Sequence, residues 1–460
     1  MRRRAAPKSN STASRRPVAL AAGSLVVLAL ALAAQRAHAA DEATTTPLLP
    51  TRDPCGSCDR PLAQASSSSI QSLPETPAPA ATFRLNDVLL NGAQALTADE
   101  LKAITQPYIG RDVTLADLET LAQAITAQYR ARGYFLAQAL VPVQTVQGGV
   151  VEISVIEGRL GKVEVLVAPD APITEARVRG FLAPLVPGQP VNAPTYERAM
   201  LLLSDQPGLR VSSALQEGME PGTTDLSVEV AGVRRWTFAA EADNHGTEES
   251  GEYRIGGTVR WLSPFGIGDN LDARALVAND NGLWFGRLAY EAPIGGNGLR
   301  AGVGLSRVNY ELGGQFENLN AHGVADVFDV SLNYPLIRQR QQNLFLRLGA
   351  DEKHLRDELD AVNFSGRKKV RGVGLGWTWE RRDEVLGGGY WASAGTLYRG
   401  KLYIEDPISR TFDQSPAGHN TEGNFSKLAF QVSRLQAIVP RHSLYLSVGG
   451  QWSDKNLDAS

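Results

Sequence analysis

Apolar and polar residues alternate at a period of two over most of the second half of the chain. In "RGVGLGWTWERRD", Val373, Leu375 and Trp377 lie on one face and mainly glycines lie on the other. Such alternation predicts β-strands with one apolar face. Eleven strands are predicted, at 235–244, 253–262, 270–279, 282–292, 298–310, 324–334, 343–349, 371–383, 388–398, 424–440 and 444–452.

The connections between these strands also alternate. "PIGGNG" is tight, whereas "EDPISRTFDQSPAGHNTEGN" is long and polar. Strands of about ten residues with short turns at one end and long loops at the other are typical of a transmembrane antiparallel β-barrel with a polar lumen. A soluble β-sandwich is the alternative, but its strands would be shorter. Aromatic residues suited to the membrane interfaces are Trp261, Trp284, Tyr290, Tyr334 and Trp391.

A different pattern covers residues 82–232, where two β-α-α-β-β modules follow one another. The first is predicted at 82–160 and the second at 161–232, with the partial barrel at 233–460. Thr97 and Glu100 form a capping box for the first helix of the first module. Gly133 and Gly208, which end the second helix of each module, are 75 residues apart. Helix-ending glycines at matching positions of the two segments indicate two copies of one module.

The first module has a predicted strand over "YFLAQALVPVQTV" that contains Pro142. Proline cannot donate a ladder hydrogen bond, so this strand is expected at a sheet edge or at a bulge. An exposed edge can bind an extended peptide by strand addition. The alternative is an edge that Pro142 merely protects, and the sequence favours neither. The candidate partner-binding residues are Tyr134, Phe135, Leu136, Gln138, Leu140, Val141, Pro142 and Gln144.

The N-terminus is predicted to be an export signal, residues 1–39, with basic residues before an apolar run and a small-residue cleavage site at Ala37-His38-Ala39. A membrane-anchor helix is the alternative. Residues 40–81 are rich in Pro, Ser, Thr and Ala and predict a flexible linker. Within it, Cys55 and Cys58 predict a local disulfide, since the βαβ context of a redox pair is absent.

Composition excludes several functional classes. Residues 1–39 hold seven of the 46 cations and no acids, so the remainder carries 39 basic against 49 acidic residues, a balance of −10. Nucleic-acid binding would need a basic footprint, so no nucleic-acid partner is expected. No phosphate-binding loop is present, so neither a nucleotide nor another cofactor is expected. With no nucleophile motif and scattered histidines, the sequence predicts neither a catalytic site nor a metal site.

Several stretches resemble one known family. "LADLETLAQAITAQYRARGYFLAQALVPVQTVQGGVVEISVIEGRLGKVEV", "DNHGTEESGEYRIGGTVRWLSPFGIGDNL" and "YPLIRQRQQNL" are similar to the TpsB transporters of two-partner secretion, the ShlB/FhaC/HecB haemolysin secretion/activation family. The modules resemble its POTRA domains. The resemblance implies an outer-membrane transporter whose periplasmic POTRA domains bind an unfolded TpsA-type exoprotein. The implied partners are that exoprotein and outer-membrane lipid.

Two features depart from the family pattern. The stretch "DRPLAQASSSSIQSL" is only a weak candidate for the family's plug helix, and the Val-Arg-Gly-Tyr motif of its inward-folded loop is not found. The family barrel has about sixteen strands, so we expect a C-terminally truncated barrel whose last strand, Leu444–Trp452, lacks a neighbour. Two alternatives to the transporter function remain: a BamA-type assembly factor for outer-membrane proteins, and an inactive truncated barrel.

Overall fold

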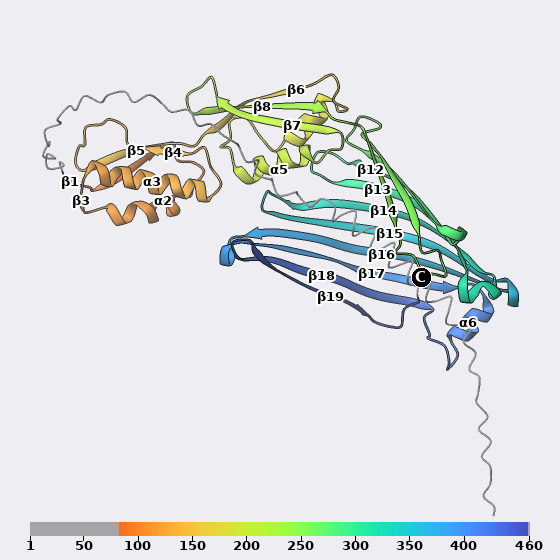
Figure 1. The fold of residues 1–460 in the computed structure, drawn as a ribbon. Coiled ribbons are helices and arrows are strands. Elements are labelled where there is room, and N and C mark those ends of the chain that lie inside the picture. Colours follow the sequence, from red (N-terminus) through yellow and green to blue (C-terminus); the bar gives the residue numbers. More distant parts are fainter. Residues whose placement is uncertain (1–81, 459–460) are drawn as a thin grey trace, which may run out of the picture.

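The computed structural model describes residues 82–458. Two small α/β modules lead into one large, curled antiparallel sheet (Figure 1). The predicted fold class is therefore confirmed: two tandem β-α-α-β-β modules precede a barrel-type sheet. The predicted export signal, linker and plug-helix candidate lie outside the described residues, and so do Cys55 and Cys58.

The first module is built on a three-stranded sheet in the order β2-β5-β4, covered by two helices. Its elements are β1 (Phe83–Arg84), β2 (Asp87–Asn91), α2 (Ala98–Thr105), η2 (Gln106–Tyr108), β3 (Asp112–Val113), α3 (Leu115–Ala131), β4 (Gln138–Leu140) and β5 (Val150–Ile156). The predicted capping box is present, because Thr97 accepts from the backbone of Glu100 while the Glu100 carboxylate accepts from Thr97. That hydrogen bond from the Thr97 backbone is the main cause that lowers the pKa of Glu100.

The second module repeats the topology of the first. Its elements are β6 (Arg159–Val167), α4 (Glu175–Leu182), α5 (Ala193–Ser204), β7 (Leu209–Glu217) and β8 (Thr223–Gly232). The sheet order is β6-β8-β7, with β6 parallel and β7 antiparallel to β8, as β2 and β4 are to β5. Gly133 and Gly208 both have positive φ, at 92° and 82°, where glycine is favoured after a helix.

The large sheet has eleven strands in sequential order, as predicted. They are β9 (Trp236–Asp243), β10 (Arg254–Leu262), β11 (Asn270–Ala278), β12 (Leu283–Pro293), β13 (Arg300–Leu312), β14 (Ala321–Arg338), β15 (Gln342–Leu359), β16 (Phe364–Asp383), β17 (Gly389–Ile404), β18 (Gly423–Val439) and β19 (His442–Ser453). Five are longer than expected: β14, β15, β16, β17 and β19 have 18, 18, 20, 16 and 12 residues. The far ends of β15 and β16 carry charged residues on both faces, which hides the alternation.

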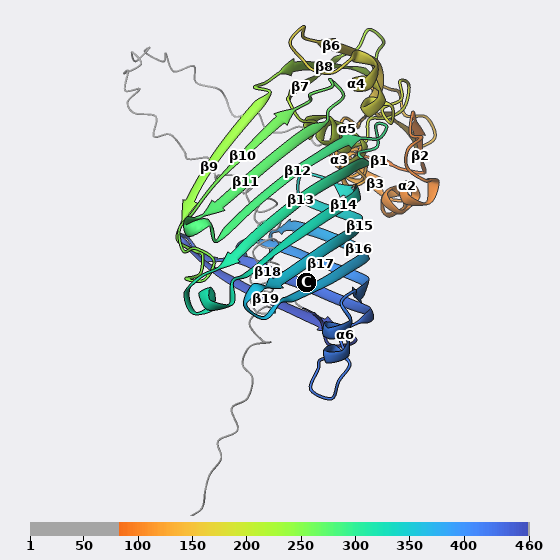
Figure 2. The same ribbon diagram turned by 90° about the vertical axis from the view of Figure 1, so that its right-hand side faces the viewer.

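The two ends of the sheet differ. The modules lie at the end where turns such as 339–341 and 384–388 connect the strands; η6 (Val385–Gly387) belongs to this near end. The far end carries η3 (Asn279–Asn281), η4 (Gly314–Leu319), η5 (Asp360–Val362) and α6 (Pro407–Asp413). Figure 2 shows α6 far from the first module. Within residues 82–458, β9 and β19 each pair on one side only, so the sheet is open. No helix in this range has the length and apolar character needed to span a membrane.

Candidate functional site

The polar face of the large sheet is its concave face. Adjacent strands lie about 4.8 Å apart, so side chains two strands apart meet most readily where curvature brings them together. Such contacts recur on the polar face: Tyr310 on β13 donates to Asp357 on β15 at 2.5 Å, passing over β14. Tyr398 on β17 likewise donates to Asp351 on β15 at 3.0 Å. The polar side chains therefore line the inside of the curved sheet.

Charges on this inner face are paired with one another. Arg287 lies 2.9 Å from Asp329, and Arg347 approaches the same carboxylate at 3.9 Å. Arg274 pairs with Glu241 at 2.7 Å, again with one strand between them. Both signs of charge thus line the interior, and the lining is hydrophilic without being strongly attractive to either sign.

The outer face carries an apolar band. Members such as Phe238, Leu375 and Leu397 are 71%, 49% and 51% exposed, as expected of side chains that face lipid. Four of the five predicted interface aromatics lie toward the near end. Trp261 stacks on Trp236 at 4.7 Å, and Arg434 lies over Trp391 at 4.7 Å. Tyr290 and Tyr334 are the other two at the near end, and Trp284 is the one of the five that lies at the far end.

The second module is fixed to the near end of the sheet by specific polar contacts. Arg338, the last residue of β14, makes a bidentate ion pair with Asp205 at 2.7 and 2.8 Å. Arg198 on α5 donates to the Pro335 carbonyl at 2.8 Å and lies over the Tyr334 ring. The arginines and Asp205 carried no recognisable pattern in the sequence, because their pairing joins residues more than a hundred positions apart.

A buried carboxylate lies at the end of the first module, next to the residue that links it to the second module. The side chain of Glu157 is 1% exposed. It accepts from the backbone N–H groups of Gln94 and Ala95 at 2.5 and 2.6 Å and from the Tyr129 hydroxyl at 2.9 Å. Burial, followed by this hydrogen bond to Glu157, raises the pKa of Tyr129. Arg159 then links Gln94 of the first module to the Gly188 carbonyl of the second.

The predicted edge strand of the first module is much shorter than expected. The stretch 134–146 was predicted as one strand, but only Gln138–Leu140 pairs, at the edge of the sheet. Beyond it the backbone leaves β5, since Pro142 has no N–H. The Gln144 side chain instead bonds both the N–H and the carbonyl of Glu152, at 2.8 and 2.7 Å.

The eight candidate residues therefore do not form one surface. Tyr134 packs against the core of the first module and Leu136 against that of the second. Phe135 and Leu140 are 37% and 42% exposed, and Gln138 is exposed, while Val141, Pro142 and Gln144 are half-buried. The outward N–H of Ala139 is already bonded to Thr126 Oγ1 at 2.9 Å. One outward backbone donor of this edge is thus already occupied.

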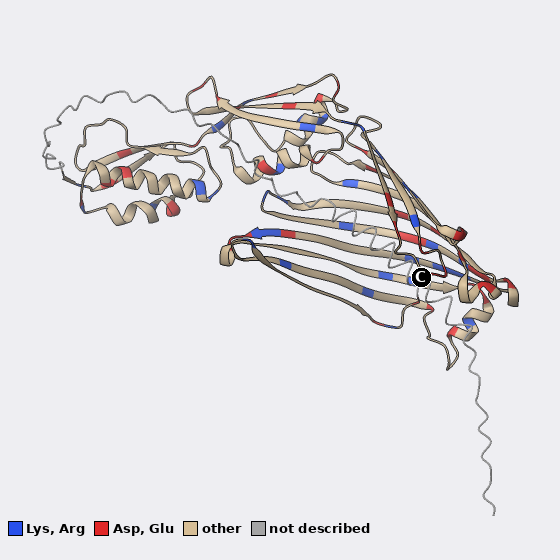
Figure 3. Ribbon diagram, in the orientation of Figure 1, with Lys and Arg blue, Asp and Glu red and all other residues tan. Residues whose placement is uncertain are grey.

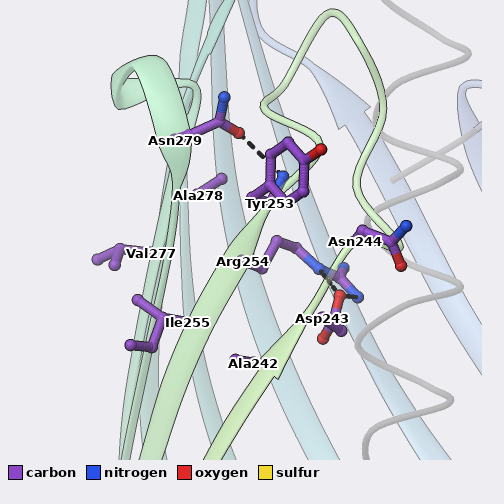
Figure 4. Close-up of a pocket in the computed structure, with 9 residues that line it drawn as sticks. All are labelled: Ala242, Asp243, Asn244, Tyr253, Arg254, Ile255, Val277, Ala278 and Asn279. Carbon is purple, nitrogen blue, oxygen red and sulfur yellow. Dashed lines mark hydrogen bonds and ion pairs between the residues drawn. The ribbon is translucent and has the colours of Figure 1, made fainter.

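A hollow of about 600 Å³ lies at the far end between β9, β10 and β11 (Figure 4). Its polar groups bond one another: Arg254 pairs with Asp243 at 2.8 Å, and the Tyr253 N–H donates to Asn279 at 3.0 Å. Nearby in the far-end region, His322 contacts Glu358 at 2.9 Å, so this histidine is not isolated as the sequence suggested.

Known proteins match both parts of the chain. The sequence profile of the POTRA domain, ShlB-type, matches residues 83–158, and that of the haemolysin secretion/activation protein ShlB/FhaC/HecB matches residues 222–460. The chain belongs to the ShlB/FhaC/HecB family. Members of this family are transporters, which agrees with the resemblance noted in the sequence.

Relatives and solved structures extend the family match. The heme/hemopexin transporter protein HuxB of Haemophilus influenzae Rd is 25% identical over 384 residues, covering 81% of this chain and 65% of HuxB. The outer membrane transporter CdiB of Escherichia coli strain 536 is 23% identical, covering 82% and 63%. The structure of CdiB from Escherichia coli has the same fold, with a TM-score of 0.65 at 19% identity over 85% of this chain and 72% of CdiB. The chain spans about two thirds of the length of these curated relatives.

Proposed function

We propose that the protein is an outer-membrane transporter that takes an unfolded exoprotein from the periplasm and passes it across the membrane along the polar inner face of its β-sheet. The observation that carries the proposal is the attachment of two POTRA modules to one end of a sheet with an apolar outside and a polar inside. That arrangement supports a membrane orientation with the modules in the periplasm and the far end at the cell surface.

The lining of this inner face suits a polypeptide in transit. Paired charges such as Arg287 and Asp329 offer hydrogen bonds without a strong net field, so an extended chain of any sequence would be neither trapped nor excluded. Phosphate-loop motifs are absent from the sequence, and no catalytic step or cofactor belongs to the proposal. The partner is an exoprotein of the TpsA type, as family membership suggests.

Secretion from intact cells tests the proposal. The chain is co-expressed with a TpsA-type exoprotein from the same organism, and the exoprotein in the medium is measured by immunoblot. We expect the exoprotein in the medium only when the chain is present. Exoprotein that stays in the periplasm while the chain is correctly inserted in the outer membrane would contradict the proposal.

For cargo contact, we propose exposed apolar side chains at the β4 edge rather than strand addition. Leu140 is exposed beside the half-buried Val141, whereas the outward N–H of Ala139 is already bonded to Thr126. Phe135 is also exposed, but its ring lies against Tyr196 of the second module, so it belongs to a separate surface. Gln138, Pro142 and Gln144 would border this contact, and Tyr134 and Leu136 would only hold its backbone in place.

Replacing Leu140 by Asp is expected to lower secretion at least about tenfold, because a charge would remove an apolar contact worth about 1.5 kcal/mol or more. The matched control is Leu89→Asp on β2, the opposite edge of the same sheet, where Leu89 is 56% exposed. Both variants should insert in the membrane. Equal secretion from the two variants would remove the β4 edge from the proposal.

A further inference from the structure

The outer face of the sheet changes from apolar to basic along a sharp line at its far end. On β16 the outward side chains run Val373, then Arg371, then Lys369; on β17 they run Leu397, Arg399 and Lys401. The neighbouring residue Leu402 is 2% exposed and packs on the inner side with Val370, which fixes Lys401 as outward by alternation. We name Lys369, Arg371, Arg399 and Lys401 the basic wall; Figure 3 colours such residues blue.

The basic wall has more positive charge than its neighbours neutralise. Glu352 is its one adjacent carboxylate on β15, shared by Lys369 at 2.5 Å and Arg371 at 2.6 Å. Among the described residues, Arg399 and Lys401 make no ion pair within 4.0 Å; Lys401 lies over the Tyr403 ring at 4.6 Å, and Asp454 attracts Arg399 from farther away. Four cations against Glu352 and the more distant Asp454 leave a local charge of +2.

The strand register places like charges directly opposite one another. Arg371 pairs with Lys401 across β16 and β17, and Arg356 pairs with Arg367 across β15 and β16. Like charges in such positions destabilise a sheet. An anion bound between them would relieve this repulsion, and guanidinium groups are well suited to phosphate because they bind it through two hydrogen bonds.

We propose that the basic wall binds the phosphate groups of lipopolysaccharide in the outer leaflet. The apolar band immediately below it would contact the acyl chains, so one lipid can satisfy both surfaces. The source is a lipid and not free phosphate because the basic wall is continuous with that band. The proposal rests on the proposed membrane orientation, which puts the far end at the outer leaflet.

Lipid binding by the full chain in non-ionic detergent tests the proposal without requiring secretion. Bisphosphorylated lipid A and its dephosphorylated form are compared by native mass spectrometry. The variant R371Q/R399Q/K401Q should bind the bisphosphorylated lipid about a hundredfold more weakly, at about fivefold for each cation lost. The control K102Q/R111Q/R210Q removes three exposed cations from the modules and should bind as the unchanged protein does.

Each outcome is decisive. Equal binding of the two lipids by the unchanged protein would overturn the proposal, as would undiminished binding by the triple variant. Competition by millimolar inorganic phosphate would show a general anion site and also overturn it. The single variant Lys401→Gln, at an exposed position, covers the case in which the triple variant does not fold; it should lose about fivefold. Failed secretion with intact lipid binding would count against the proposed function alone.

Discussion

Replacing Glu157 by Ala is expected to loosen the first module by about 3 kcal/mol or more. The change leaves three groups without their acceptor, namely the N–H groups of Gln94 and Ala95 and the Tyr129 hydroxyl. Each buried polar group left unsatisfied costs about 1–3 kcal/mol. Hydrogen exchange of the β5 amides in the full chain should accelerate more than about a hundredfold, since exchange reports local opening free energy.

The control for this experiment is Glu119→Ala, which removes an exposed carboxylate from α3 of the same module. Its β5 amides should exchange at the unchanged rate. The account of Glu157 as the organising acceptor fails if its variant accelerates exchange by less than about tenfold. Secretion by the Glu157 variant should fall as well, because the proposed cargo contact at Leu140 lies on the strand paired with β5.

Gly298→Val is expected to displace the second module from the sheet. Gly298 has a φ of 90°, and a Cβ there would lie 2.6 Å from Leu202 Cδ2 and 2.6 Å from Pro335 Cγ. Valine would combine backbone strain with overpacking, each about 1–3 kcal/mol. Because Leu202 belongs to the buried core of the module, the clash cannot be relieved at the surface.

Double electron–electron resonance between spin labels at Arg210 and Glu384 measures this displacement, in a chain with Cys55 and Cys58 changed to Ser. The distance distribution should broaden in the Gly298 variant. Gly295→Val is the matched control: it lies in the same turn with a φ of 72°, but a Cβ there meets nothing within 4 Å. Equal distributions in both variants would mean that backbone strain, and not the contact with Leu202, governs the joint.

Local patterns predicted the elements well and their contacts poorly. The period of two located all eleven strands, and the Thr97 capping box was visible at three-residue spacing. The β4 edge was overestimated because Pro142 ends pairing, which the apolar run around it conceals. The Arg338–Asp205 pair could not be predicted, because it depends on how the end of β14 packs against α5 and the two residues are 133 positions apart.

The contacts that pass over an intervening strand have a mechanical consequence. Tyr310 with Asp357 and Tyr398 with Asp351 each tie together three consecutive strands. Flattening the sheet at either of the two strand pairs that such a hydrogen bond spans would stretch that hydrogen bond. The sheet should therefore resist a change of curvature at a single strand pair. Any change in the width of its interior should involve several strands together, so that a passing polypeptide would meet an interior of nearly constant width.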